Sequence, residues 1–305
     1  MKSALCDKNS LQDKKTRRAP FRVLITGGGC VEKIDNVRAI TNFSSGKTAL
    51  LIARVLKALN PAAAVTYLMS ERAVQPKIAG DFCKTKTAGK AETSGKAKNA
   101  GRASAVCDSV KKFSSCADLQ KLLRAELSAN KYDLLFHAAA VSDYSVQSLS
   151  VDGKEFKPGK IAKISGADEV LVRLKKNPKL LEQIPALAKK KNKRAVVVGF
   201  KLTSNASEAE REAAVQKLFA AKNPPDFVIS NDLSEITPKS HPCVLWRAGD
   251  KTQSACKAKK GGAAAPGAGK KAVGASGAAN NAGAPVAIAR GQIQTIVRKI
   301  YAFDS

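Results

Sequence analysis

Three consecutive glycines are the first residues whose type and spacing could do chemistry. Gly27, Gly28 and Gly29 interrupt an apolar, β-rich run, and glycines in such a place let backbone N–H groups approach a phosphate. Their spacing matches neither G-x-G-x-x-G nor a Walker A loop, since Lys47 lies too far along the chain. A plain tight turn explains them about as well. They therefore indicate a loop that could accept an anion, and no more.

A second group follows within twenty residues. It consists of Arg38 and Asn42 and then Ser44, Ser45 and Gly46. Small hydroxyl side chains and a glycine at a helix start can cap the helix, and the residues alone slightly favour that reading. The alternative is that Asn42 and the free N–H groups hold an anion or an amide.

Small residues also close an apolar run at 138–144, which reads AAAVSDY. Such residues, Ala139 among them, would let a flat nucleotide lie against the backbone. Close packing of a helix on the sheet explains them too, and without context it is the favoured reading. Asp143 could accept from a ribose hydroxyl or lie beside Mg²⁺, but a turn residue is the commoner role for such an Asp.

Three lysines supply the remaining candidate charges. Lys157, Lys160 and Lys163 fall in a loop-like stretch, where a mobile lysine could neutralise charge on a polyphosphate, although most such lysines are simply solvated. His137 and His241 form no Ser–His–Asp or Cys–His arrangement, so packed or hydrogen-bonded histidines are expected.

The elements that must position these groups alternate between strands and helices. Apolar runs predict strands, and apolar residues at helical spacing predict helices. The predicted strands are 21–26, 64–69, 106–113, 132–141, 170–174, 195–200, 226–232 and 244–246. The predicted helices begin near residues 46, 116, 177, 207 and 292, and a loose stretch is expected from 142 to about 165. This order predicts an α/β fold with a doubly wound, mostly parallel, Rossmann-like sheet and helices on both faces.

The distribution of charged and apolar residues indicates which parts of the chain can fold. The 305 residues carry a formal charge of +28, which alone suggests a polyanion partner. Many of the lysines, however, lie in segments with few large apolar side chains, which cannot offset their ordering entropy. We expect a disordered basic arm at 1–20, a single domain over 21–305, and two disordered low-complexity insertions at about 80–105 and 251–285.

Cysteine usage and hydropathy bear on location. The seven cysteines are scattered without a C-x-x-C pair, which argues against structural zinc and for free thiols in a reducing compartment. No run is long enough to span a membrane, and the N-terminus lacks the apolar core of a secretory signal. The cytoplasm is the expected location, with no membrane partner.

Taken together and in order, these segments resemble the phosphopantothenoylcysteine synthetases, also called phosphopantothenate–cysteine ligases. The glycine run and the pattern V-R-x-I-x-N-x-S-S-G resemble the start of that family. Four further segments are similar to its motifs: 138–144, 163–164 with 177–181, 198–202 and 226–232. Five matches in order over 21–235 make chance agreement unlikely.

The resemblance implies a ligase that condenses 4′-phosphopantothenate with L-cysteine in coenzyme A biosynthesis. A nucleoside triphosphate first activates the carboxylate as an acyl-nucleotidylate and releases pyrophosphate, and the cysteine amine then attacks the acyl group. Mg²⁺ is expected on the polyphosphate. The stretch 198–202 is similar to the eukaryotic type, which favours ATP over CTP. A monofunctional enzyme and a homodimer, in which each subunit helps complete the other's site, are also implied.

Residue roles follow from the same resemblance. Asn42 would bind the pantothenate acyl region and hold the intermediate, supported by Arg38, and Lys163 would stabilise charge during acyl transfer. Ser44, Ser45 and Gly46 in the same loop, and Ala139, would also bind the substrate. The residues expected to meet the nucleotide are Gly27, Gly28, Gly29, Ala139, Asp143, Lys163, Pro178, Lys179, Leu180, Leu181, Phe200 and Lys217. Metal ligands are not identified, and Cys30 stands where the family usually shows Thr.

Two other function classes fit the sequence less well. A Rossmann-type NAD(P) oxidoreductase would need a G-x-G-x-x-G loop and an acidic residue ending the second strand, and the sequence has neither. A basic nucleic-acid-binding protein would account for the +28 charge, but aromatic residues are not interleaved with the lysines. No specific nucleic acid partner is therefore expected.

Overall fold

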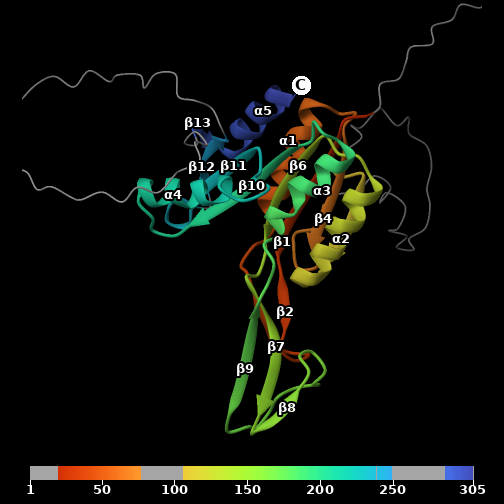
Figure 1. The fold of residues 1–305 in the computed structure, drawn as a ribbon, viewed down its shortest axis with the longest axis vertical. Helices are drawn as coiled ribbons and strands as arrows, with labels where there is room; N and C mark the ends of the chain where they lie inside the picture. The colour runs from red at the N-terminus through yellow and green to blue at the C-terminus, as the bar shows by residue number, and fades with distance from the viewer. Residues whose placement is uncertain (1–19, 77–105, 238, 249–285, 305) are drawn as a thin grey trace, which may run out of the picture.

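The computed structural model describes residues 20–76, 106–237, 239–248 and 286–304 (Figure 1). The predicted arm, apart from Pro20, and both predicted insertions lie outside these residues. Within them, no helix combines the length and the apolar character needed to cross a membrane.

An eight-stranded sheet forms the centre of the molecule (Figure 1). Its strands are β1 Arg22–Gly29, β4 Ala64–Ser70, β5 Ser109–Phe113, β6 Leu134–Ala140, β10 Val196–Thr203, β11 Phe227–Asp232, β12 Pro242–Arg247 and β13 Val286–Gln292. Their order across the sheet is β13-β12-β11-β10-β6-β1-β4-β5. The strands from β11 to β5 are parallel, whereas β12 and β13 join antiparallel at one edge. The predicted mostly parallel, Rossmann-like sheet is confirmed.

Helices cover both faces of this sheet, also as predicted. They are α1 Lys47–Leu59, α2 Cys116–Ala129, α3 Ile184–Lys191, α4 Glu208–Phe219 and α5 Ile293–Asp304. Alternate strand residues point to opposite faces, so Phe136 packs in the cluster that contains α1 and α5, whereas Leu135 packs with α2 and α3. Ser115 and Ser207 start α2 and α4 with capping boxes, which satisfy backbone N–H groups of the first turn.

The chain changes direction across the sheet at its centre. From β1 it passes to β4 and β5 on one side, and it later returns to place β6 against the other side of β1. The register pairs Gly27 with Ala138 and Gly29 with Ala140. Parallel α/β sheets bind ligands beyond the carboxyl ends of the strands at such a switch point.

A small antiparallel sheet forms an arm that projects away from the main sheet (Figure 1). It consists of β7 Tyr144–Val151, β8 Lys154–Phe156 and β9 Val170–Lys176 in the order β8-β7-β9. The expectation of a loose stretch from 142 to 165 was therefore wrong for the hairpin of β7 and β8, whereas residues 157–165 contain no strand. Serines alternate with apolar residues in β7, and this period of two was the signal for a strand. A second hairpin, β2 Val31–Lys33 with β3 Ala39–Thr41, was also not predicted.

The glycines do not form the loop that was predicted, because β1 continues through Gly29 and pairs with β6. Close packing requires them instead. A Cβ on Gly27 would lie 2.4 Å from Cβ of Ala49, and one on Gly29 would lie 1.9 Å from the carbonyl oxygen of Asn42. Gly28 also has a φ of 89°, in the left-handed region that favours glycine.

The helix predicted to begin at 177 starts later. A 3₁₀ turn, η2 Leu180–Glu182, precedes α3, and Pro185 rather than Pro178 lies in the first turn of that helix. Asn177 is held outside the helix, since its backbone N–H donates to the carbonyl of Asp143 and its amide donates to the carbonyl of Ser142.

Candidate functional site

A groove of about 1270 Å³ opens at the carboxyl ends of β6, β10 and β11. Its walls come from the start of α1, the η2 turn, one side of α4 and the segment that follows β11. Of the residues predicted to meet substrate or nucleotide, the following line it: Ser44, Ser45, Gly46, Ala139, Asp143, Pro178, Lys179, Leu180, Leu181, Phe200 and Lys217. Five segments far apart in the sequence thus converge on one cavity, as expected for a ligand site at a switch point.

The floor of the groove is the end of β6, where backbone groups are fixed by a buried hydrogen-bond chain. The N–H of Ala139 donates to Oγ1 of Thr26 at 3.1 Å, and that hydroxyl lies 2.9 Å from Nδ1 of His137. Burial lowers the pKa of His137 to about 4, so the ring is neutral and Nδ1 can accept from the hydroxyl. His137 is therefore a hydrogen-bonded packing residue, as predicted.

The start of α1 faces the groove with its backbone N–H groups available. Gly46 is the N-cap with a φ of 73°, it makes no side-chain cap bond, and the first turn contains no acidic residue. Ser45 Oγ accepts a long hydrogen bond of 3.5 Å from the backbone N–H of Lys47. The capping interpretation is therefore confirmed only in part: Gly46 is the N-cap and Ser45 contacts one N–H, while no side chain caps the rest of the first turn and the positive end of the helix dipole is left open to an anion.

Asn42 lies just behind this wall. Its Oδ1 accepts from Oγ of Ser142 at 2.6 Å, and its backbone N–H donates to the carbonyl of Cys30 at 3.3 Å. Ser142 lines the groove, whereas Asn42 itself is not among the lining residues. The segment before α1 and the end of β6 are thus joined through one side-chain hydrogen bond.

Besides Asn42, three predicted groups lie outside the lining of the groove. Gly27, Gly28 and Gly29 are buried against neighbouring elements, as described above. Arg38 makes structural contacts instead: its Nη1 lies 2.9 Å from Oδ2 of Asp35, and its Nη2 donates to the carbonyl of Ile164. Lys163, next to Ile164, is exposed.

Asp35 is a structural residue that the sequence reading missed. Its carboxylate is buried and accepts from the backbone N–H groups of Val37, Arg38 and Ile164. Burial would raise the pKa of Asp35, but these hydrogen bonds and the charge of Arg38 hold it below its usual value. The cluster ties the segment of Lys163 to the loop before Asn42. Its signal was the short spacing of Asp35, Val37 and Arg38, typical of an Asx turn.

Positive charge predominates along the groove. Five lysines line it, namely Lys47, Lys179, Lys201, Lys217 and Lys239, against three acidic residues. Of those acids, Asp143 is paired with Lys179 at 2.6 Å, and Glu210 accepts from Ser207 in the capping box of α4. This excess suits a ligand that carries several negative charges.

The far end of the groove contains two polar residues that the sequence reading did not select. Nδ2 of Asn231, at the end of β11, lies 2.9 Å from Nε2 of His241, and both residues line the cavity. Burial lowers the pKa of His241, so its unprotonated nitrogen can accept from the amide. Asn231 could have been selected from the sequence, because the predicted strand 226–232 ends in polar residues.

The thiol of Cys30, at the position where Thr was expected, is fully buried. Burial raises its pKa to about 12, so the thiol is protonated and unreactive at neutral pH. Its backbone carbonyl, rather than its sulfur, contributes to the site by accepting from Asn42 and from Thr41.

The sequence matches the profile of the DNA/pantothenate metabolism flavoprotein C-terminal domain over residues 19–108 and 94–266. The chain belongs to this family. The match includes every segment that lines the groove except the end of β13 and the start of α5.

Curated relatives of this domain are named coenzyme A biosynthesis bifunctional protein CoaBC. That of Methanocaldococcus jannaschii is 28% identical over 214 residues, which are 70% of this chain and 41% of the relative. That of Thermococcus kodakarensis is 26% identical over 224 residues, 73% of this chain and 44% of the relative. The chain thus spans less than half the length of the curated relatives it matches.

Solved structures support the fold. A DNA/pantothenate metabolism flavoprotein from Streptococcus pneumoniae superposes with a TM-score of 0.55 at 24% identity, covering 74% of this chain and 88% of that one. The C-terminal domain of a CoaBC protein gives 0.52 at 17% identity, with 93% of each chain covered. A Cab2 mutant in complex with phosphopantothenate-cysteine gives 0.51 at 21% identity, with 74% and 76% covered.

Proposed function

We propose that this protein is a phosphopantothenate–cysteine ligase that joins 4′-phosphopantothenate to L-cysteine at the expense of a nucleoside triphosphate. Membership of the family and the CoaBC names of its relatives support this activity. The observation that carries it is the single groove into which five family-matched segments converge, at the switch point of the sheet. The Cab2 mutant, which has a related fold, was solved in complex with phosphopantothenate-cysteine, the product of the proposed reaction.

In the first step, an oxygen of the substrate carboxylate attacks the α-phosphorus of the nucleotide, and the bond to pyrophosphate breaks. This converts a poor electrophile into an acyl-nucleotidylate. The proposal assigns the nucleotide to the region of Ala139, the η2 turn and Phe200, where small and apolar residues line the groove. The lysines on the rim, Lys179 and Lys217 among them, and the open N-terminus of α1 would stabilise the phosphates.

In the second step, the amine of cysteine attacks the acyl carbon, the bond to the nucleotide breaks, and an amide forms. Asn42 is proposed to hold the acyl region, positioned by its hydrogen bond with Ser142. Lys163 is proposed to approach the reacting group, with its segment anchored through Ile164 to Asp35 and Arg38. Catalysis would rest on positioning and charge neutralisation, which needs no nucleophilic side chain.

Magnesium is proposed to enter with the phosphates of the nucleotide. The described residues contain no group of three or more His, Cys, Asp or Glu side chains that could hold a metal ion. Because Mg²⁺ commonly keeps several waters and binds substrate phosphates, a dedicated protein cage is not required. ATP is the proposed nucleotide, with CTP as the alternative.

A homodimer built through the arm is part of the proposal. The arm exposes large apolar side chains, including Phe156, Val170, Leu171 and Leu174. Exposed apolar surface of this kind commonly marks an interaction site. A Leu171→Ser/Leu174→Ser variant should reduce the mass measured by light scattering to that of one chain, whereas Leu233→Ser, equally exposed but outside the arm, should not. An unchanged mass in the arm variant would refute a homodimer formed through the arm.

The role of Asn42 is tested by Asn42→Ala. Turnover should fall by about 100-fold or more while the melting temperature changes little, because the side chain makes one hydrogen bond at the edge of the groove. Asn36→Ala is a matched control, since Asn36 is exposed and its hydrogen bond to the carbonyl of Ile161 is made by its backbone N–H. Near-normal turnover of Asn42→Ala would remove Asn42 from the mechanism.

A further inference from the structure

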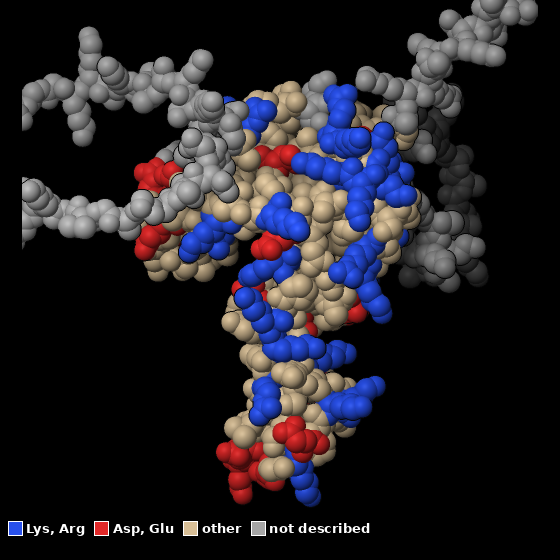
Figure 2. Space-filling model, in the orientation of Figure 1, with Lys and Arg blue, Asp and Glu red and all other residues tan. Residues whose placement is uncertain are grey.

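Positive charge extends well beyond the groove. Figure 2 shows Lys and Arg side chains over the face that carries α3 and along the arm, whereas acidic side chains gather at the tip of the arm and beside α4. These cations are spread over separate elements, and dispersed surface charges of this kind are mostly solvated. They do not form a site by themselves.

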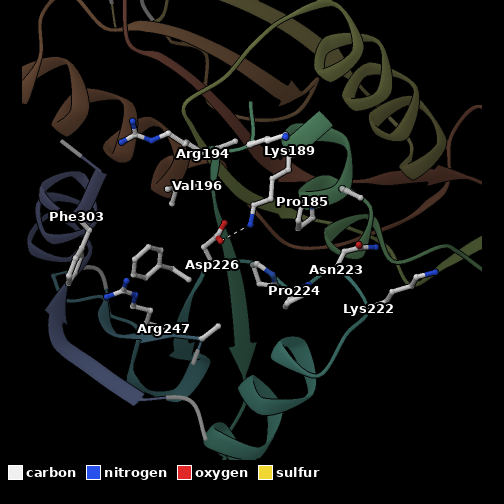
Figure 3. A pocket seen from close by; sticks show the side chains of 16 residues that line it. Pro185, Lys189, Arg194, Val196, Lys222, Asn223, Pro224, Asp226, Arg247 and Phe303 are labelled. Carbon is white, nitrogen blue, oxygen red and sulfur yellow. Dashed lines mark hydrogen bonds and ion pairs between the residues drawn. The ribbon is translucent and has the colours of Figure 1, made fainter. Parts of the chain in front are cut away.

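A second cavity, of about 670 Å³, lies at the amino ends of β10 and β11 (Figure 3). Its acidic residue, Asp226, is bonded through both oxygens, since Oδ1 lies 2.7 Å from Nζ of Lys189 and Oδ2 accepts from the backbone N–H of Val197. The side chains of Arg194 and Lys222 extend to opposite sides of the cavity (Figure 3). The cations of this cavity therefore do not converge on one ligand.

Polar residues do converge at the base of the arm, where four of them form a continuous hydrogen-bond chain that ends at Asn42. Oγ of Ser145, in β7, donates to Oδ1 of Asn177 at 2.9 Å. Nδ2 of Asn177 donates to the carbonyl of Ser142 at 3.0 Å, and Oγ of Ser142 donates to Oδ1 of Asn42 at 2.6 Å. The chain thus connects the first residues of the arm with the residue that is proposed to hold the acyl group.

The chemistry of each partner fixes the direction of this chain. A backbone carbonyl can only accept, so the amide nitrogen of Asn177 faces Ser142 and its oxygen faces Ser145. The hydroxyl proton of Ser142 goes to Oδ1 of Asn42, which turns Nδ2 of Asn42 away from Ser142. Within the described part of the chain, that nitrogen has no hydrogen-bond partner but is not buried, so it can donate to a ligand.

Asn177 can hold Ser142 in place because Asn177 is itself fixed. Its backbone N–H donates to the carbonyl of Asp143 at 2.8 Å, which joins the end of β9 to the start of β7. Pro178 follows it, and a residue before proline is biased towards an extended conformation. Residues 141–143 lie between β6 and β7 and belong to neither strand. The amide of Asn177 therefore supplies a hold on the Ser142 carbonyl that the sheets do not.

We propose that Asn177 is a positioning residue for Asn42, acting through Ser142, and that the orientation it sets lets Nδ2 of Asn42 donate to the acyl oxygen of the substrate. Negative charge develops on that oxygen when the cysteine amine attacks the acyl carbon, so a donor held in advance stabilises the transition state. This role rests on the proposed ligase function, and it adds the residues that orient Asn42.

The test is a double-mutant cycle in which formation of the cysteine amide by the whole protein is measured. Asn177→Ala and Ser142→Ala should each lower kcat about tenfold, because a hydrogen bond that orients Asn42 is lost, and should leave the KM for nucleotide within about twofold. In an Asn42→Ala background, neither substitution should lower kcat further, because the group that they orient is absent. Ser142→Ala keeps the carbonyl that Asn177 contacts, so it separates loss of orientation from loosening of the arm.

Ser148→Ala is the matched control, since Ser148 lies in the same strand as Ser145 and its hydroxyl has no partner among the described residues. Its kcat should equal the wild-type value. The positioning role is overturned if Asn177→Ala or Ser142→Ala retains the wild-type kcat, or if either loss is multiplied in the Asn42→Ala background, as a general structural effect would be. A wild-type protein that forms no amide would refute the ligase function and this role with it, whereas an active wild type with multiplied losses would refute only the positioning role.

Discussion

Substituting Gly29 by alanine is the perturbation whose effect the structure specifies most fully. The added Cβ would lie 1.9 Å from the carbonyl oxygen of Asn42, an atom of the backbone that no rotamer change can move. An ordinary contact of about 3.5 Å requires the two to separate by roughly 1.5 Å. Overpacking of this kind costs about 1–3 kcal/mol in the free energy of unfolding. For a domain of this size, the melting temperature should fall by about 2–12 °C.

The same displacement should impair turnover beyond its effect on stability. If Asn42 holds the acyl group, moving its backbone by more than about 1 Å should reduce kcat/KM roughly 100-fold even well below the melting temperature. Pyrophosphate release and thermal unfolding of Gly29→Ala measure the two effects separately. Gly291→Ala is the control, because its Cβ would meet Thr295 only at 3.8 Å. Wild-type turnover and melting temperature in Gly29→Ala would refute the reasoning.

Three further predictions follow from the site and its supports. Lys163→Ala should reduce turnover more than Lys160→Ala in the pyrophosphate assay, and the reverse order would mean that the catalytic lysine is misplaced. His241→Ala should raise the KM for nucleotide about fivefold with kcat little changed, because it frees the amide of Asn231, and an unchanged KM would exclude that role. Hydrogen bonds from Ser234 and Thr203 hold the pKa of Asp232 well below its usual value, so its stabilising contribution is complete above an unfolded-state pKa of about 3.9 and is lost as the pH falls through the folded-state value. The melting temperature should therefore fall more steeply in acid for the wild type than for Asp232→Asn, and parallel curves would contradict this.

Much of the main sheet was predictable because its strands are buried on both faces. Runs such as Leu134–Phe136 and Val196–Val198 are continuously apolar, and only a central parallel strand accommodates such a run easily. The arm was missed because its strands are partly exposed and rich in serine and lysine, so hydropathy gave a weak signal. The glycines of β1 were misjudged because their cause is tertiary: the backbone of Asn42 and the side chains of Ala49 and Tyr67 approach them from elsewhere in the chain.

The candidate site was predictable where motifs end strands or start helices. Residues such as Ala139, Ser45 and Phe200 meet in the groove because the switch point brings those ends together. The long-range contacts of the supports were not predictable. Local spacing signals the Asx turn of Asp35 but not its bond with Ile164, and it contains no information about the partners of Ser142 and His241, which the fold alone brings near.

The most direct measurement of the central claim is pyrophosphate release from purified protein given 4′-phosphopantothenate, L-cysteine, Mg²⁺ and either ATP or CTP in parallel titrations. The proposal predicts pyrophosphate release that depends on phosphopantothenate, formation of the cysteine amide only when cysteine is present, and a higher kcat/KM with ATP. Absence of pyrophosphate with both nucleotides, under conditions in which the protein is folded, would contradict the proposal that this groove is a ligase site.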